Sequence, residues 1–462
     1  MGIWLIKLPF YALFSESKAK KWREKRRIRY ENLRIAKKCF KAIRTLSPQI
    51  KDWTKSSEFK DKYANHPYPP LLNPQNIDYE SIHADLAWEL NLPLPPKYDL
   101  IYFNNGATAS LHILEFFKRC EIALNPYWVG AIELDYRQKY EMDYNLLLKR
   151  KNEPFNVIAL YLQKPKINKY CALLGKSVPL FYVSRDPISR IKSACNHDAG
   201  VEINPNMKHL SINDTDFATL FPQTKYWGKD GASATPKVET GLFAPTLYPK
   251  ICFDSFLAQM PHLGQKYIFS FESFAPNRTF ETFKKIAKIF NLNMPNDERL
   301  FSTRAEKARF GLGVLPVVLE HSGARIHISA DSSVRSDEKN EILTEAVIGG
   351  GGQKHYFIND TEIIIYADKA SNITAHKDFE VIKAYLQKYI KALENNVAMT
   401  LKSLVSETQI LEALRGDSQN RKALKELFDR ELGYLKENHA DIVKSWKYYN
   451  EFEAMCAELD ST

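Results

Sequence analysis

The sequence has little of what would place a protein in an oxidising compartment or across a membrane. Its six cysteines are scattered over 462 residues without a C-x-x-C pair. This favours reduced thiols in the cytosol and argues against a disulfide framework or a zinc site. The histidines are not at metal-ligand spacing, so no structural metal is expected. The apolar stretch at residues 3–14 is interrupted by Lys7 and Pro9 and falls short of the roughly 20 residues of a membrane span.

Two common sequence signals are also missing: a signal peptide at the N-terminus and a complete Walker A loop. No basic stretch precedes residues 3–14 and no small-residue cleavage site follows them, so we expect no signal peptide. Gly175, Lys176 and Ser177 look like the end of a Walker A loop, but Tyr170 stands where the first glycine belongs. The glycine run at 349–352 is expected to be a mobile hairpin loop.

The positive charge is concentrated at one end of the chain. The net charge is +10, but residues 1–50 contain fourteen Lys and Arg and three Glu, so the rest of the chain carries −1. Apolar and aromatic residues followed by this basic cluster are typical of a segment lying in an anionic membrane interface. We therefore predict a peripheral protein at the inner face of the cytoplasmic membrane, bound through residues 1–30. A solvated basic helix is the alternative; no nucleic-acid partner is expected.

Composition shifts and periodicity predict five regions. They are a basic amphipathic arm (1–50), a linker with a short helix (51–97), a core domain (98–310), a small strand-containing insertion (311–375) and a helical C-terminal region (376–462). In the core, apolar strands at 98–103, 157–162, 180–184 and 267–271 alternate with helices at 111–120, 131–150 and 279–292. This alternation predicts an α/β fold with a doubly wound, mainly parallel sheet. Residues 200–250 are predicted to be long loops.

The segment FYVSRDPISRIKS, residues 181–193, is the most informative motif. Arg185 leaves the end of an expected strand, and Ser193 follows two turns into the next helix. An arginine offers bidentate, charge-assisted hydrogen bonds and a serine adds a directed one, so the pair suits a phosphate. The alternative is a strand–turn–helix junction whose arginine caps a local group.

A second candidate anion site follows the first core strand. The stretch FNNGATAS places a small glycine-containing loop, residues 104–110, between a strand and a helix. Backbone N–H groups at such a loop, together with the helix dipole, favour an anion. The candidate binding residues of this loop are Asn104, Asn105, Gly106, Ala107, Thr108, Ala109 and Ser110.

These two elements, in this order, resemble the donor-binding elements of sulfotransferases that use 3′-phosphoadenosine-5′-phosphosulfate (PAPS). The strand and helix at YIFSFESF, residues 267–274, extend the resemblance, which covers about residues 98–300. It implies a sulfotransferase-type sheet, with PAPS as co-substrate and no metal. By the same resemblance, Arg185 and Ser193 hold the 3′-phosphate and the loop at 104–110 grips the 5′-phosphosulfate.

One position departs from the family pattern. Asn104 stands where the family usually has a lysine that steadies the leaving phosphate. Losing that cation would cost on the order of several kcal/mol of transition-state stabilisation. The cations that could replace it are Lys164, Lys166, Arg190, Lys192 and Arg309.

Transfer to a hydroxyl also needs a general base. Glu133 and Asp135 are the first candidates and His197 is the second; the alternatives are a solvated helix face and a capping histidine. The whole chain, including PPLLNP and AWELNLPLP within residues 69–95, also resembles an uncharacterised bacterial family associated with surface-polysaccharide genes, which implies a glycan acceptor.

The sequence therefore predicts transfer of a sulfuryl group from PAPS to a sugar hydroxyl of a surface glycan or its lipid-linked precursor. One alternative is transfer of another phosphoryl-type group from a nucleotide-linked donor. The other is a non-catalytic nucleotide-binding scaffold of a polysaccharide assembly.

Overall fold

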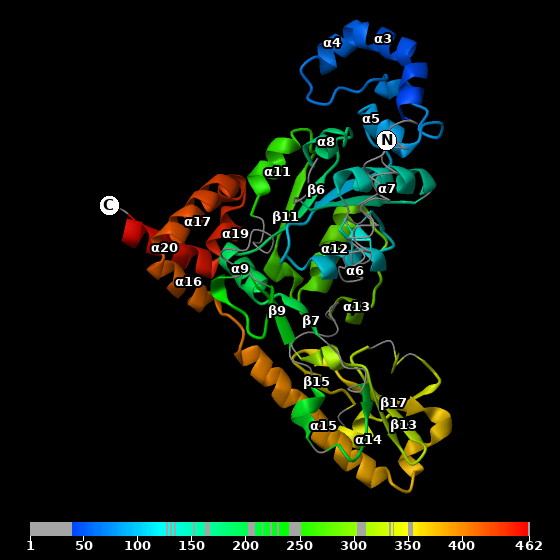
Figure 1. Ribbon diagram of the computed structural model, residues 1–462, viewed down its shortest axis with the longest axis vertical. Coiled ribbons are helices and arrows are strands. Elements are labelled where there is room, and N and C mark those ends of the chain that lie inside the picture. Colours follow the sequence, from blue (N-terminus) through cyan, green and yellow to red (C-terminus); the bar gives the residue numbers. More distant parts are fainter. Residues whose placement is uncertain are drawn as a thin grey trace, which may run out of the picture.

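The computed structural model describes residues 39–125, 128–129, 132–133, 135–150, 153–161, 167–201, 208–214, 216–221, 224–228, 231–239, 251–302, 311–331, 334–335, 337–349 and 354–460. The predicted membrane-surface segment, residues 1–30, lies outside these ranges. Within them, no helix combines the length and apolar character needed to cross a bilayer. Figure 1 shows an elongated molecule, with α3 (Ser47–Lys55) and α4 (Ser57–Tyr63) at one end and a second sheet at the other.

A five-stranded parallel sheet forms the centre of the molecule, as the alternation of strands and helices predicts. Its strands are β1 (Leu100–Phe103), β2 (Ala123–Asn125), β5 (Asn156–Leu160), β6 (Leu180–Ser184) and β11 (Lys266–Ser270). They are ordered β11-β6-β1-β5-β2, and every neighbouring pair is parallel. The α/β class and the mainly parallel sheet are thereby confirmed.

Successive side chains of these strands enter two separate hydrophobic clusters, one on each face of the sheet. In β1, Ile101 and Phe103 belong to one cluster, whereas Leu100 and Tyr102 belong to the other. This alternation is the geometry of a strand buried on both faces, and it explains the continuous apolar runs in the sequence.

Helices cover both faces of the sheet. One face packs against α6 (Ser110–Arg119), α12 (Thr279–Phe290) and α13 (Arg299–Ser302). The other packs against α5 (Ala84–Glu89), α7 (Tyr136–Lys149), α8 (Ile167–Ala172), α9 (Pro187–Cys195) and α11 (Phe253–Gln259). The sheet is thus doubly wound.

The strand order places β1 at the switch point of the sheet. After β1, the chain adds β2 and β5 on one side, then crosses to add β6 and β11 on the other. In open α/β sheets, ligands bind outside the carboxyl ends of the strands at such a point. The residues that follow β1 and β6 therefore occupy the place where a ligand is expected.

A second, mixed sheet lies at the other end of the molecule. It consists of β8 (His209–Leu210), β12 (Val317–His321), β13 (Ala324–Ser329), β14 (Asn340–Ile342) and β17 (Ile364–Asp368), in the order β14-β17-β13-β12-β8. Only the pair β12–β8 is parallel among these strands. α14 (Thr344–Ile348) and the long helix α15 (Phe379–Lys402) share its hydrophobic cluster.

This mixed sheet corrects two sequence predictions. It is larger than the small insertion expected at 311–375, because it takes α15 from the predicted C-terminal region and β8 from the predicted loops. Residues 200–250 also contain β9 (Thr224–Gly228) and β10 (Gly231–Ser233), which pair with β7 (Asp198–Val201). The two residues of β8 and the three of β10 are too few for periodicity to mark them.

The remaining strands of the described residues form two short hairpins. One pairs β3 (Trp128–Val129) with β4 (Ile132–Glu133), and the other pairs β15 (Phe357–Ile358) with β16 (Thr361–Glu362). Residues 51–63, predicted as the start of a linker, are mostly helical within α3 and α4.

The helical C-terminal region is present as predicted. Its helices are α16 (Glu407–Gly416), α17 (Ser418–Glu431), α18 (Gly433–Asn438), α19 (Ala440–Lys444) and α20 (Lys447–Asp460). They pack on the parallel-sheet domain, because Phe428, Trp446 and Phe452 belong to the same hydrophobic cluster as Tyr182 and Ile188.

Reciprocal helix caps fix this packing. Asp254 of α11 accepts a hydrogen bond from the backbone N–H of Tyr434 (3.0 Å), and Glu431 accepts one from the backbone N–H of Ser255 (3.0 Å). Each region therefore caps a helix of the other.

Candidate anion-binding site

The two sequence-predicted elements meet at the carboxyl edge of the parallel sheet. β1 and β6 are neighbours, with Phe103 paired to Tyr182, so both strands end on the same side. Arg185 Nη1 donates a hydrogen bond of 2.8 Å to the carbonyl oxygen of Ala107 in the loop at 104–110. Residues 78 positions apart in the sequence are thus in direct contact.

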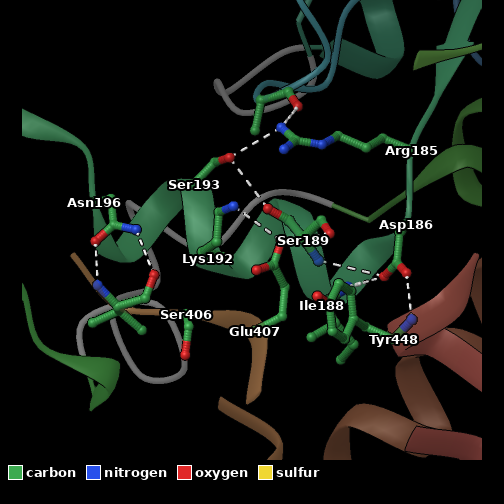
Figure 2. Close-up of polar contacts among 12 residues, drawn as sticks. Arg185, Asp186, Ile188, Ser189, Lys192, Ser193, Asn196, Ser406, Glu407 and Tyr448 are labelled. Atoms are coloured by element: carbon green, nitrogen blue, oxygen red, sulfur yellow. Dashed lines mark hydrogen bonds and ion pairs between the residues drawn. The ribbon is translucent and has the colours of Figure 1, made fainter. Parts of the chain in front are cut away.

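Arg185 and Ser193 also contact each other. Arg185 Nη1 donates to Ser193 Oγ at 3.0 Å, and Ser193 Oγ donates to the carbonyl oxygen of Ser189 at 3.2 Å (Figure 2). The guanidinium carbon lies 4.0 Å from the centre of the Phe271 ring. Phe271 is a contact that the sequence alone does not reveal, since it comes from the segment after β11. The ring holds the guanidinium plane without neutralising its charge.

The charge of Arg185 is not balanced by a direct ion pair within the described residues. Burial lowers the pKa of Arg185 to about 10, which leaves the guanidinium protonated at neutral pH. Both of its hydrogen bonds to the described part of the chain use Nη1, so Nε and Nη2 have no acceptor there. Such a partly buried cation with spare donors is suited to bind an anion.

The loop at 104–110 has an unusual backbone. Gly106, Ala107 and Ala109 have φ angles of 77°, 55° and 58°, whereas Thr108 between the two alanines is not left-handed. An alanine in the left-handed region costs about 1–2 kcal/mol. Alternation of this kind turns successive N–H groups toward one side, as in backbone nests that bind anions.

The start of α6 adds to this character. Its N-cap residue, Ala109, makes no side-chain hydrogen bond to the first turn. The first N–H groups of a helix have no intrahelical acceptor, and they favour a negative charge when no side chain caps them.

Asn104 braces the loop from within. Its Oδ1 accepts hydrogen bonds from the backbone N–H of Gly106 (2.9 Å) and from Ser110 Oγ (2.7 Å). Two groups that sequence reasoning assigned to a phosphate thus have an internal partner. Asn104 is fully buried, so it organises the loop rather than supplying the cation that a lysine would.

The cations proposed to replace that lysine have other roles where the structure describes them. Arg190 is 2% exposed and its Nη2 donates to the carbonyl oxygen of Asn105 at 2.7 Å. Lys192 forms an ion pair with Glu407 at 3.0 Å. Lys164, Lys166 and Arg309 lie outside the described residues.

Asp186, next to Arg185, caps the N-termini of two helices. Its Oδ1 accepts from the N–H of Ile188 (2.9 Å) at the start of α9, and its Oδ2 accepts from the N–H groups of Tyr448 (2.9 Å) and Tyr449 (3.2 Å) at the start of α20. The Asp-Pro pair signals the first cap. No local pattern could signal the second, because α20 lies more than 250 residues further along the chain.

The predicted general bases lie at different places. Asp135 is the N-cap of α7: its Oδ1 accepts from the N–H groups of Arg137 and Gln138, both at 2.9 Å, in a capping box. Glu133 ends β4, and its side chain is outside the described set. His197 follows α9 directly and is exposed.

Comparison with known proteins gives one match. A family model described as a protein of unknown function (DUF2972) matches residues 271–459. No curated protein and no solved structure matches the chain. The matched part begins at Phe271 and includes most of the mixed sheet and the C-terminal helices, whereas the loop at 104–110 and Arg185 precede it.

Proposed function

We propose that this protein is a sulfotransferase-like transferase that moves a sulfuryl group from PAPS to a sugar hydroxyl. The acceptor would be a surface glycan or its lipid-linked precursor at the cytoplasmic face of the membrane. The observation that carries the proposal is the position of Arg185: a partly buried cation with spare donors beside a strained loop, at the switch point of the parallel sheet.

Each part of the site has a role in this reaction. The Arg185 guanidinium binds the 3′-phosphate, and the hydroxyl of Ser193 turns from the Ser189 carbonyl to donate to the same group. The backbone N–H groups of the loop at 104–110, other than those of Asn104 and Gly106, and the first turn of α6 face the 5′-phosphosulfate. Catalysis then rests on positioning and on electrostatic stabilisation.

The transfer itself is an in-line displacement at sulfur. The acceptor hydroxyl oxygen forms a bond to sulfur while the bond from sulfur to the bridging phosphate oxygen breaks, and 3′-phosphoadenosine-5′-phosphate leaves. A carboxylate or imidazole takes the hydroxyl proton. Glu133, Asp135 and His197 stay the candidates, and Glu133 ranks first since Asp135 already caps α7.

Asn104 favours a second candidate function. Because its amide is used to brace the loop, it does not neutralise charge at the reacting end of the donor. A nucleotide-linked donor of another phosphoryl-type group would fit the same binding elements without needing that lysine.

Calorimetry on the full chain tests the proposal. We expect 3′-phosphoadenosine-5′-phosphate to bind more tightly than ADP, since only the former carries a 3′-phosphate. Equal affinity for the two nucleotides would refute the PAPS donor. Preferential binding without turnover on any glycan fraction would favour the scaffold function.

The membrane part of the proposal has its own test. Deleting residues 1–30 removes nine Lys and Arg, each contributing about 1 kcal/mol near an anionic surface. The truncated protein should no longer sediment with anionic vesicles, and unchanged sedimentation would contradict the anchor.

A further inference from the structure

The C-terminal helices bring a negative charge to the helix that carries Ser193. Glu407 is the first residue of α16, and its Oε1 accepts a hydrogen bond from Ser189 Oγ at 2.9 Å. The same oxygen pairs with Lys192 Nζ at 3.0 Å. Both partners lie on α9, on the turns that include Ser193, as Figure 2 shows.

Glu407 is held in this position by its neighbours. Asn196 donates to the carbonyl oxygen of Val405 (2.8 Å) and accepts from its N–H (2.9 Å), so the entry to α16 is fixed on the end of α9. Ser406 and Gln409 then form a capping box that starts the helix. The side chain of Glu407 is only 13% exposed. The position of this carboxylate is therefore fixed by the packing of α16 on α9.

The charge of Glu407 reaches Arg185. A short chain of contacts joins them: Arg185 donates to Ser193, Ser193 donates to the Ser189 carbonyl, and the Ser189 hydroxyl donates to Glu407. Burial is the largest influence on the pKa of Arg185 and lowers it; the charge of Glu407 comes next and raises it. Within the described residues, Glu407 is the acidic group with the largest effect on this guanidinium.

We infer that Glu407 is a built-in counter-ion that sets how strongly the site of Arg185 and Ser193 attracts anions. The inference rests on the proposed function, because it assumes that an anion binds there. Without ligand, the carboxylate stabilises the partly buried guanidinium; when an anion enters, the carboxylate repels it. This repulsion weakens binding of small free anions. A nucleotide still binds, because it makes additional contacts along the loop at 104–110.

Charge-changing variants of the full chain test this inference by calorimetry, with 3′-phosphoadenosine-5′-phosphate and inorganic sulfate as probes. In Glu407→Gln the amide oxygen still accepts from Ser189 while the charge is lost, so we expect both probes to bind about fivefold more tightly. Lys192→Gln leaves Glu407 without its cationic partner and should weaken binding of both probes several-fold. Glu412→Gln is the matched control, since Glu412 is exposed on the same helix, and should bind as the unchanged protein does.

The outcomes separate this inference from the proposed function. If the nucleotide is preferred over ADP but Glu407→Gln binds like Glu412→Gln, the counter-ion is refuted and the proposed function stands. If Glu407→Gln weakens binding as Lys192→Gln does, the contact only holds α9 in place and the inference is again refuted. If sulfate binding tightens in Glu407→Gln while the nucleotide shows no preference over ADP, the counter-ion stands and the PAPS donor fails. If neither probe binds to the unchanged protein or to Glu407→Gln, both the inference and the proposed function are overturned.

Discussion

The two large sheets of this protein are made of similarly apolar strands but distribute their polar groups differently. In the parallel sheet, β5 and β6 are buried at every position, and the polar residues collect where the strands end. In the mixed sheet, β12 and β13 alternate between buried and accessible positions. There, a His327–Tyr366 stack lies on the accessible face of the sheet.

The physical reason is the direction of the strands. Parallel strands all finish at one edge, so the residues that follow β1 and β6 are brought together whatever their separation in sequence. Antiparallel neighbours finish at opposite edges, so the mixed sheet cannot collect loop groups in this way. The comparison explains why the candidate anion site belongs to the parallel sheet.

The two regions also differ in how they use left-handed backbone. At the edge of the parallel sheet, Ala107 and Ala109 take this conformation. In the mixed-sheet region the same conformation falls on Ser322, Asn359, Asp360 and Asn372. Asn and Asp tolerate it well and alanine does not, so the two alanines place strain in the loop of the candidate site.

The largest expected effect is the loss of stability when a side chain is truncated in a strand that is buried on both faces of its sheet. Phe181→Ala removes a fully buried ring of the parallel sheet, and we expect it to lower the free energy of unfolding by about 3–5 kcal/mol. Val318→Ala, at an accessible position of β12, should cost much less. Urea denaturation measures both. Similar losses of unfolding free energy would show that the two sheets do not differ in how well they tolerate truncation of a side chain.

The next effect concerns the aspartate that caps two helices. Asp186→Ala removes the acceptor for the N–H groups that start both α9 and α20, and each cap contributes about 1–2 kcal/mol. Asp368→Ala, in the mixed-sheet region, removes the acceptor of one exposed hydrogen bond from the backbone N–H of Ala370 and is the control. A loss of stability no larger than that of the control would contradict the double cap.

The third prediction compares an arginine without a carboxylate partner with one that has such a partner. Arg185→Ala should weaken the binding of 3′-phosphoadenosine-5′-phosphate by about 1.5–3 kcal/mol and remove its higher affinity relative to ADP. Arg335, which pairs with Glu362 at 2.7 Å in the mixed-sheet region, is the control, and Arg335→Ala should bind normally. Retained nucleotide preference in Arg185→Ala would return that arginine to a structural role.

The smallest expected effect concerns the backbone strain of a left-handed alanine in the loop at 104–110. Ala109→Gly relieves a left-handed alanine and should raise the free energy of unfolding by up to about 1 kcal/mol. Asn372→Gly, at a φ of 41° in the mixed-sheet region, should change stability less, because asparagine tolerates this conformation. Thermal unfolding of the two variants decides whether the strain is larger at the edge of the parallel sheet.

Local pattern predicted most of the parallel-sheet domain. The strand at 180–184 coincides with β6, and the helix at 111–120 differs from α6 by one residue at each end. Continuous apolar runs and clear breakers mark these elements. By contrast, β8 has two residues, and the apolar stripe of α15 does not say which sheet it covers.

The residues of the candidate site also fall into those that the sequence predicted and those that it did not. Arg185, Ser193 and the loop at 104–110 were found from residue type and spacing, because each is a short local motif. Phe271, Glu407 and the second cap of Asp186 were missed, because each is a contact between segments far apart in the chain.

The sequence by itself determined β1, β5, β6 and β11 of the parallel sheet and which residues have the chemistry to bind an anion, because periodicity and side-chain type act locally. Only the tertiary structure decided that Arg185 contacts Ala107, that Asn104 braces its own loop and that Glu407 pairs with Lys192. These contacts depend on strand order and helix packing, which are set by the burial of the whole apolar core.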